Sequence, residues 1–221
     1  SGNVYTTGGF SGPVDFDSGS GSQIVTGQSS GSLYVHKLDS AGNFLWAQTI
    51  SGPDSLNSSA SGNSLSLDHT GHLYVAGAFR DSIDFDPGPD SVFLDAGLGT
   101  DLHTLKMDID GNFIWAKQFG ESGMGVAVEI EHFDVDHVYL TGRFWGAIDF
   151  DPGSDTTILT AYGSYEDQFV LRLDSAGNMI WVRRIGGTGW DAGEDLAVDK
   201  FGNVYTTGYY LGTVDFDPGP G

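Results

Sequence analysis

Four copies of an Asp-Phe-Asp motif carry the side chains best suited to chemistry in this sequence. Residues i and i+2 of a strand share a face, so each copy should place two carboxylates together and turn its Phe toward the core. Neighbouring carboxylates repel each other unless a proton or cation lies between them. Calcium takes about six to eight oxygen ligands, and the following turn supplies backbone carbonyls. The motif therefore predicts one Ca²⁺ per copy, at Asp15 and Asp17, Asp84 and Asp86, Asp149 and Asp151, and Asp215 and Asp217.

A second interpretation of the motif needs no metal. The first Asp would cap a turn, and the second would lie in solvent at the edge of a sheet. The motif matches no EF-hand loop and lacks a Glu at the spacing such a loop requires. In the first copy Ser18 stands where the other copies have Pro, which weakens that site.

The motifs recur because the whole chain is a repeat. Each copy follows a Val-Tyr or Leu-Tyr segment, and the tyrosines at positions 5, 74, 139 and 205 are separated by 69, 65 and 66 residues. Self-similarity at a fixed period is typical of repeat architectures. The elements that position the carboxylates should therefore be the same in every period.

Each period predicts a series of short strands. In the third period we expect strands at 125–130, 138–144, 168–173 and 179–183, with an extra strand at 157–160. The second of these should run on towards Phe150. Turn residues separate these apolar runs, and no window has the 3.6-residue apolar period of a helix. The sequence thus predicts an all-β fold of antiparallel strands.

Asp-x-x-Gly-Asn segments join the third and fourth strands of each period. Such a segment lies at 39–43, 108–112 and 174–178, and a related one at 199–203. Asp caps a type I turn and Gly adopts the left-handed conformation that follows, so hairpin chemistry explains them. The fourth strands carry Trp46, Trp115 and Trp181, which we interpret as packing residues.

The segments just described resemble the bacterial β-propeller repeats known as SBBP repeats, and more distantly NHL repeats. The resemblance is carried by the Val-Asp-x-x-Gly-Asn-Val-Tyr core at residues 198–205 and covers nearly the whole chain. It implies four-stranded antiparallel blades of about 66 residues, with the first strand nearest the axis and the fourth at the rim. By this likeness 196–198 is an inner segment and Trp181 an outer residue.

The period divides the chain into three full periods plus a half-blade. We expect a first blade without its inner strand at 1–59, a second at 60–124, a third at 125–190, and the inner half of a fourth at 191–221. The chain starts and stops inside a repeat, so we interpret it as a piece of a longer protein. Residues 195–199 could complete the first blade, within one chain or in a neighbouring one, and an unpaired edge would otherwise invite aggregation. We therefore expect self-association or contact with neighbouring repeats.

Composition excludes several classes of function. The chain has 30 acidic and nine basic residues, a formal net charge of −21, and no cysteine. Nucleic acid is not an expected partner because phosphate contact requires a basic face. No stretch approaches the roughly 18 apolar residues of a membrane span, so we expect no membrane insertion. The charge suits cation binding or an acidic, soluble surface.

No catalytic constellation is evident. The six histidines form neither a His-x-His nor a His-Glu-x-x-His pair, and Gly-x-Ser-x-Gly is absent. The paired carboxylates recur in every period, whereas a catalytic centre is normally unique, so we expect no enzyme activity. Trp145 and Trp190 depart from the repeat pattern and should be exposed, where either could stack on a sugar.

Together these features predict a secreted or cell-surface bacterial module without catalysis, stabilised by calcium, with a role in adhesion or self-assembly. One alternative is a carbohydrate- or matrix-binding module that uses Trp145 and Trp190. A second is the subunit of a self-assembling extracellular fibre.

Overall fold

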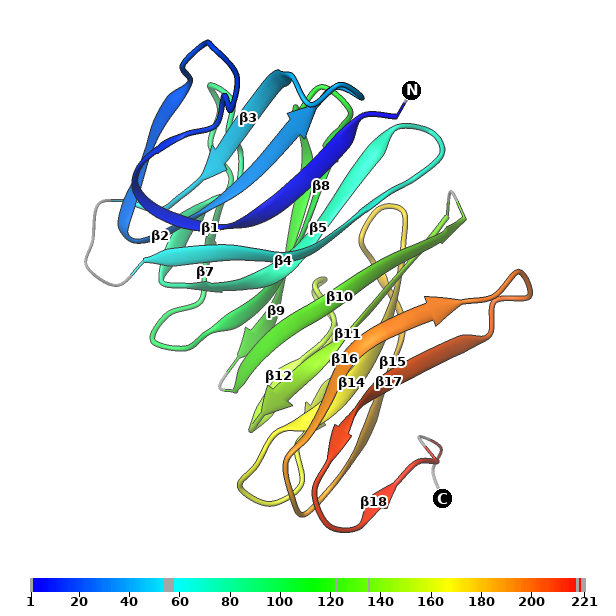
Figure 1. The fold of residues 1–221 in the computed structure, drawn as a ribbon. Helices are drawn as coiled ribbons and strands as arrows, with labels where there is room; N and C mark the ends of the chain where they lie inside the picture. Colours follow the sequence, from blue (N-terminus) through cyan, green and yellow to red (C-terminus); the bar gives the residue numbers. More distant parts are fainter. Residues whose placement is uncertain (1, 54–57, 122, 135, 218, 220–221) are drawn as a thin grey trace.

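The computed structural model describes residues 2–53, 58–121, 123–134, 136–217 and 219. These residues form strands and turns without a helix, so the predicted all-β fold is confirmed. Within them no helix has the length and apolar character needed to cross a membrane. The sheets follow one another in chain order, with the termini at opposite ends of the molecule (Figure 1).

Three antiparallel sheets contain most of the chain. The first has the order β1 (Val4–Asp15), β2 (Ile24–Leu38) and β3 (Phe44–Ile50). The second runs β4 (Ser59–Leu67), β5 (His72–Arg80), β8 (Asp101–Asp108) and β9 (Phe113–Glu121). The third runs β10 (Met124–Asp134), β11 (His137–Trp145), β14 (Asp167–Asp174) and β15 (Met179–Gly187).

A two-stranded sheet of β16 (Asp191–Val198) and β17 (Val204–Tyr210) ends the series. Short strands follow each second strand and carry the Asp-Phe-Asp motifs: β6 (Ser82–Asp84) with β7 (Phe93–Asp95), β12 (Ala147–Asp149) with β13 (Ile158–Thr160), and β18 (Val214–Asp215). All five strands expected in the third period are present, and the extra strand at 157–160 is β13. The second strand does not run on continuously as expected: β11 ends at Trp145, and 147–149 form the separate short strand β12.

The burial pattern explains the near-continuous apolar runs of the middle strands. In β5 every residue from Leu73 to Gly77 is buried, and in β8 every residue from Asp101 to Met107. Sheets lie against both faces of these strands, so successive side chains enter two different cores. The sequence of a strand that is covered on both faces is a continuous hydrophobic run and does not alternate between apolar and polar residues.

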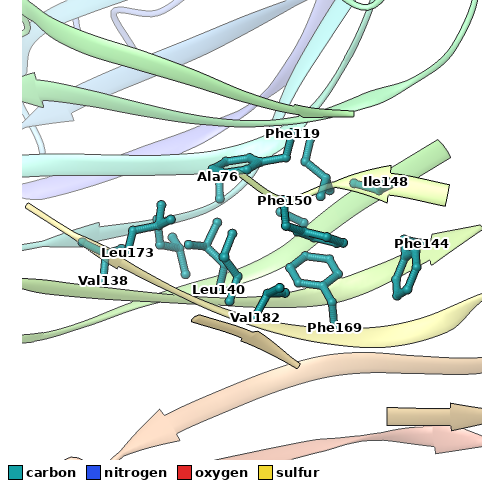
Figure 2. Packing of buried hydrophobic residues seen from close by; sticks show 14 of the residues in the cluster. Ala76, Phe119, Val138, Leu140, Phe144, Ile148, Phe150, Phe169, Leu173 and Val182 are labelled. Carbon is teal, nitrogen blue, oxygen red and sulfur yellow. The ribbon is translucent and has the colours of Figure 1, made fainter. Parts of the chain in front are cut away.

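The cores lie between successive sheets. One cluster joins the first sheet to the second and includes Leu33, Val35, Leu73 and Val75. The other joins the second sheet to the third, and Figure 2 shows its aromatic centre. There the ring centroids of Phe150 and Phe169 are 5.1 Å apart. Each sheet is therefore stabilised mainly by its neighbours, as expected of stacked repeats.

The first strands of successive sheets pack against one another. Strand β10 contacts both β4 and β16, and the Asn63 side-chain amide donates to the Ala127 carbonyl at 2.8 Å. The fourth strand of each unit lies on the side away from the first strand, and beyond β9 and β15 only the short strands of the next unit follow. This order places 196–198 on the inner side and Trp181 on the outer side, as the resemblance implied.

Candidate interaction surfaces

The Asp-Phe-Asp motifs close the short hairpins through their own backbone. Asp84 Oδ1 accepts hydrogen bonds from the N–H groups of Asp86 at 3.2 Å and Val92 at 2.8 Å. Asp86 Oδ1 accepts from the N–H of Gly88 at 2.7 Å. The copies at Asp15 and Asp17 and at Asp149 and Asp151 repeat all three bonds. The copy at Asp215 and Asp217 repeats the two bonds to Asp217 N–H and Gly219 N–H. Both carboxylates of a pair therefore cap a turn.

The placement of the two carboxylates on one strand was wrong. The strand ends at the first Asp in every copy, for example at Asp84 in β6 and Asp149 in β12. The second Asp belongs to the turn, because its carboxylate bonds to the Gly N–H two residues later. The middle Phe was placed correctly in three copies, since Phe16, Phe85 and Phe150 are buried, whereas Phe216 is exposed.

The fit of these motifs to calcium is partial. Backbone N–H groups bond to one oxygen of each carboxylate, and the Ser22 hydroxyl donates to Asp15 Oδ2 at 2.9 Å. The other Oδ2 atoms remain for a cation that takes about six to eight oxygens. Among the described residues, no group of three or more His, Asp or Glu side chains is arranged to hold a metal ion. Most ligands would have to be water and backbone carbonyls. Calcium binding stays a prediction.

The motif hairpins also connect neighbouring sheets. Strand β12 pairs with β9 of the preceding sheet through Ile148 and Asp149, and β18 pairs with β15 through Val214 and Asp215. Asp84 forms a bridge with Ser51, just after β3. The hairpin of each unit thus extends the fourth strand of the unit before it, which blunts an otherwise exposed edge.

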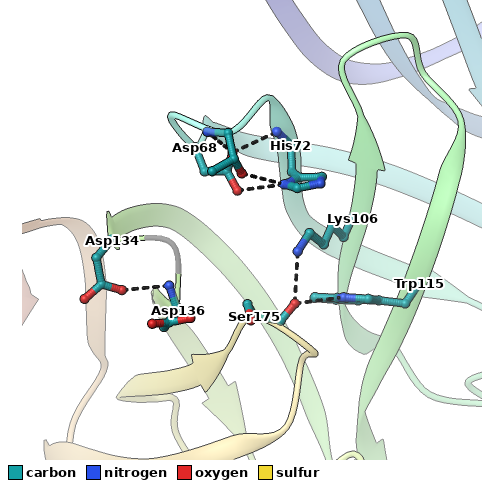
Figure 3. Close-up of polar contacts among 8 residues, drawn as sticks. Asp68, His72, Lys106, Trp115, Asp134, Asp136 and Ser175 are labelled. Atoms are coloured by element: carbon teal, nitrogen blue, oxygen red, sulfur yellow. Dashed lines mark hydrogen bonds and ion pairs between the residues drawn. The ribbon is translucent and has the colours of Figure 1, made fainter.

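A second contact between units uses a Tyr, a basic residue and a Trp, which we call the turn-binding triad. In the second sheet the triad is Tyr74, Lys106 and Trp115. The Lys106 Nζ donates to the Ser175 carbonyl at 3.0 Å, and the Trp115 Nε1 donates to the same oxygen at 3.2 Å (Figure 3). Lys106 lies 4.9 Å from the centroid of the Tyr74 ring.

The first sheet has a corresponding triad of Tyr5, Lys37 and Trp46, in which Trp46 Nε1 makes no hydrogen bond within the described residues. Lys37 Nζ donates to the Ile109 carbonyl at 2.8 Å and lies 5.4 Å from the Tyr5 centroid. Ile109 and Ser175 occupy the same position in their Asp-x-x-Gly-Asn turns. Each triad therefore binds the turn between the third and fourth strands of the next unit.

The Asp-x-x-Gly-Asn turns have the structure expected from hairpin chemistry. Asp39 Oδ2 accepts from the Asn43 side-chain amide at 2.8 Å, and its Oδ1 accepts from two backbone N–H groups. The Asn43 side chain and backbone bonds lower the pKa of Asp39. Gly42 has the positive φ that this turn requires. The packing role of the three tryptophans is also confirmed, because each lies edge-on to a Tyr of its own sheet.

The C-terminal unit exposes residues whose counterparts are buried. Tyr74 and Phe85 are fully buried, whereas Tyr205 is 59% exposed and Phe216 is 63% exposed. In the second sheet β8 and β9 cover the equivalent positions. No described strand pairs with the free edge of β17. This unpaired, aromatic edge is one candidate interaction surface.

The two non-repeating tryptophans gather around one loop. Trp145 is 44% exposed and Trp190 is 45% exposed, so the expected exposure is confirmed. Trp145 Nε1 donates to the Ser164 carbonyl at 3.2 Å, and the ring centroids of Trp190 and Tyr165 are 5.5 Å apart. Tyr165 follows Ser164 directly, so the structure brings both tryptophans to the loop between β13 and β14.

Two buried carboxyls at the start of third strands were not anticipated. Asp101 accepts from the Gln118 amide at 2.6 Å, and Asp167 accepts from the Tyr162 N–H at 2.9 Å. Burial raises the pKa of both carboxyls to about 6 despite these bonds. The available signal was that both occupy the same position directly before an apolar strand. Sequence reasoning passed over it because buried charges in folded proteins are rare.

Comparison with known proteins agrees with this geometry. Residues 180–209, which span β16 and most of β15 and β17, match the family model described as a β-propeller repeat (SBBP). The chain is also 26% identical over 190 residues to an uncharacterized WD repeat-containing protein of Acanthamoeba polyphaga mimivirus. That match covers 76% of this chain and 13% of the viral protein, so the chain spans a small part of its relative. The resemblance to the bacterial β-propeller repeat family is thereby confirmed over residues 180–209.

Proposed function

We propose that this chain is a non-catalytic module of β-propeller-type repeats that binds other protein surfaces through its terminal units. One observation carries the proposal: Tyr205 and Phe216 are exposed, although the repeat buries their counterparts Tyr74 and Phe85 completely. An exposed apolar patch beside an unpaired strand edge is a surface suited to a partner. A structural role in adhesion or self-assembly follows most directly from such a surface.

The setting of this role is part of the proposal. The resemblance to bacterial repeats implies a secreted or cell-surface protein. Calcium at the Asp-Phe-Asp hairpins would then stabilise the connections between units. Detection of the protein on intact cells or in the medium, rather than only after lysis, would support this location.

Self-association is tested by light scattering after size-exclusion chromatography over a wide range of protein concentrations. With a net charge of −21 per chain, copies repel each other, so the series should include about 0.5 M salt to screen the charges. We expect a mass above one chain, and replacement of Tyr205 and Phe216 by Ser should change the protein concentration at which this assembly forms. Leu98→Ser is the control, because Leu98 is fully exposed in a loop of another unit. A single-chain mass at every concentration would contradict self-assembly.

A carbohydrate- or matrix-binding module is the second candidate. The observation that favours it is the aromatic group of Trp145, Tyr165 and Trp190 around one loop. Exposed aromatic rings offer flat apolar faces to a sugar ring. A glycan-array signal that is lost in both Trp145→Ala and Trp190→Ala, with unchanged thermal unfolding, would establish this function. Retention of the signal in both variants would exclude it.

A further inference from the structure

The third sheet has a turn-binding triad on which no described turn lies. Its members are Tyr139, Arg172 and Trp181, and the ring centroids of Tyr139 and Trp181 are 6.2 Å apart with an interplanar angle of 65°. The corresponding values for Tyr74 and Trp115 are 6.1 Å and 66°, so the two triads have the same geometry. Arg172 lies over the Tyr139 ring at 5.4 Å.

Arg172 lacks the hydrogen bond to a turn that the basic residues of the other two triads make. Its counterparts Lys37 and Lys106 donate to turn carbonyls, whereas Arg172 Nε is buried without a hydrogen-bond partner among the described residues. A buried donor without an acceptor costs free energy, because the group has lost its hydrogen bonds to water. The third triad is therefore built to receive a turn that this unit does not meet.

One turn of the chain matches this triad. Residues 39–43 have the sequence Asp-Ser-Ala-Gly-Asn, identical to residues 174–178, whose Ser175 carbonyl lies on the second triad. In the 39–43 turn all residues from Ser40 to Asn43 are exposed. The first unit thus presents, uncovered, the same turn that the second triad already binds.

The segment that contains β1 is also a near duplicate of the segment that contains β17. Each residue of 2–17 lies 200 positions before its counterpart in 202–217, and 12 of these 16 pairs are identical. Strand β17 pairs with β16 from Val204 to Tyr210, and β1 contains the first five of these residues at Val4 to Gly8. Strand β1 pairs with β2 alone among the described strands, so its other edge is open.

We propose that two copies of this chain associate head to tail by strand exchange, a mode that rests on the proposed self-assembly function. Strand β1 of the second copy replaces β17 beside β16 of the first copy. The resulting sheet has four strands, namely β16 of one copy followed by β1, β2 and β3 of its partner. The 39–43 turn of the partner then lies on the third triad, and the partner's Ser40 carbonyl accepts the hydrogen bond from Arg172.

The strand pairings that the exchange breaks are replaced by equivalent pairings with the partner copy. The pairing of Val204 to Gly208 with β16 is replaced by that of the identical Val4 to Gly8, and the pairing of Tyr209 and Tyr210 by that of Gly9 and Phe10. The pairing of Val214 and Asp215 with β15 is replaced by that of Val14 and Asp15. The gain is new: strands β2 and β3 cover the third sheet, and Arg172 acquires an acceptor. Because the contact is heterologous, repetition gives a ring or an open filament.

A disulfide that holds β17 on β16 tests the exchange directly. Ala197 and Tyr205 are exposed and directly opposite each other on β16 and β17, at a separation that a disulfide can span. The chain has no cysteine, so Ala197→Cys with Tyr205→Cys forms a single defined bridge. The control bridge, Ser59→Cys with Arg80→Cys, joins the facing strands β4 and β5, which do not exchange.

The readout is the mass from light scattering with and without reductant. We expect the oxidised Ala197–Tyr205 variant to have the mass of one chain and the reduced form to have the mass of two or more. The control variant should assemble in both states. Assembly of the oxidised variant would overturn strand exchange while leaving self-assembly intact. A single-chain mass in the wild-type chain and in every variant would overturn both proposals.

Substitutions at Arg172 test the third triad separately. Arg172→Met retains the apolar contact with Tyr139 but removes the donor, so we expect the dissociation constant of the assembly to rise roughly tenfold or more. Arg172→Lys restores a donor like those of the first two triads and should recover most of the affinity. Equal affinities for all three proteins would show that the 39–43 turn does not lie on this triad.

Discussion

Asp84 accepts the N–H of Val92, eight residues later, at 2.8 Å, and this bond closes the hairpin that joins the second unit to the first. The same carboxylate caps the N–H of Asp86. The bridge between Asp84 and Ser51 connects the two sheets at this point. One side chain therefore holds together a turn and a contact between units.

Replacement of Asp84 by Ala should destabilise the fold. Two buried or half-buried N–H groups lose their acceptor, which costs about 1–3 kcal/mol of unfolding free energy. Asp84→Asn keeps an acceptor oxygen and should cost less than half as much. Denaturant unfolding measures both, with Asp90→Ala as the control, because Asp90 is exposed in the same hairpin. Equal stability of Asp84→Ala and Asp90→Ala would refute the capping role.

Calcium binding can be separated from capping by comparing thermal unfolding in calcium and in excess chelator. A ligand that binds only the folded state raises its apparent stability by mass action. We expect the chelator to lower the midpoint by about 5 °C, which corresponds to roughly 1–2 kcal/mol in a domain of this size. Asp86→Asn with Asp151→Asn should reduce the shift. An unchanged midpoint would assign the carboxylates to turn capping alone.

The buried carboxyls Asp101 and Asp167 should make stability depend on pH. Burial raises their pKa from 3.8 to about 6, so between these values the folded chain holds protons that the unfolded chain has released. Their contribution is complete below about pH 4 and is lost as pH rises through 6. It amounts to at most about 3 kcal/mol per carboxyl, because a tenfold change in proton affinity corresponds to roughly 1.4 kcal/mol.

His103 changes stability with pH in the opposite direction. Variants of Asp101 and Asp167 are therefore needed to isolate the effect of the two carboxyls. Burial lowers the pKa of His103 from 6.5 to about 4, and its contribution is therefore lost as pH falls through that range. Relative to the wild type, Asp101→Asn with Asp167→Asn should gain stability as pH rises from 4 to 7. Urea unfolding at several pH values gives this difference. A difference that does not vary with pH would show that neither carboxyl titrates in this range.

Gly77 allows the backbones of two strands to approach closely. A Cβ atom at this position would lie 1.9 Å from the Ser61 carbonyl oxygen and 2.8 Å from His103 Nε2. We expect Gly77→Ala to lower the unfolding free energy by about 1–3 kcal/mol, since the strands must move apart. Gly9→Ala is the matched control, because its Cβ would meet no atom closer than 3.6 Å. Similar stabilities of the two variants would contradict this account.

Much of the local structure was predictable because it depends on nearby residues. The Asp-x-x-Gly-Asn turns form as expected, since Asp39 bonds to atoms no more than four residues away. The expected strands of the third unit were predictable from their apolar runs and from the turn residues between them. The partner of β12 was not predictable, because Ile148 and Asp149 pair with β9 of another unit through a contact between packed sheets.

The sequence by itself determined the period, the strands, the turns and the positions of the repeated side chains. Only the tertiary structure decided which of those side chains are covered. Tyr74 and Tyr205 occupy the same place in the repeat, yet one is fully buried and the other is 59% exposed. A turn forms from bonds within a few residues, whereas burial requires the neighbouring strands to be present. Arg172 shows the same division, because its place in the triad follows from the repeat, whereas its lack of a partner among the described residues follows from packing.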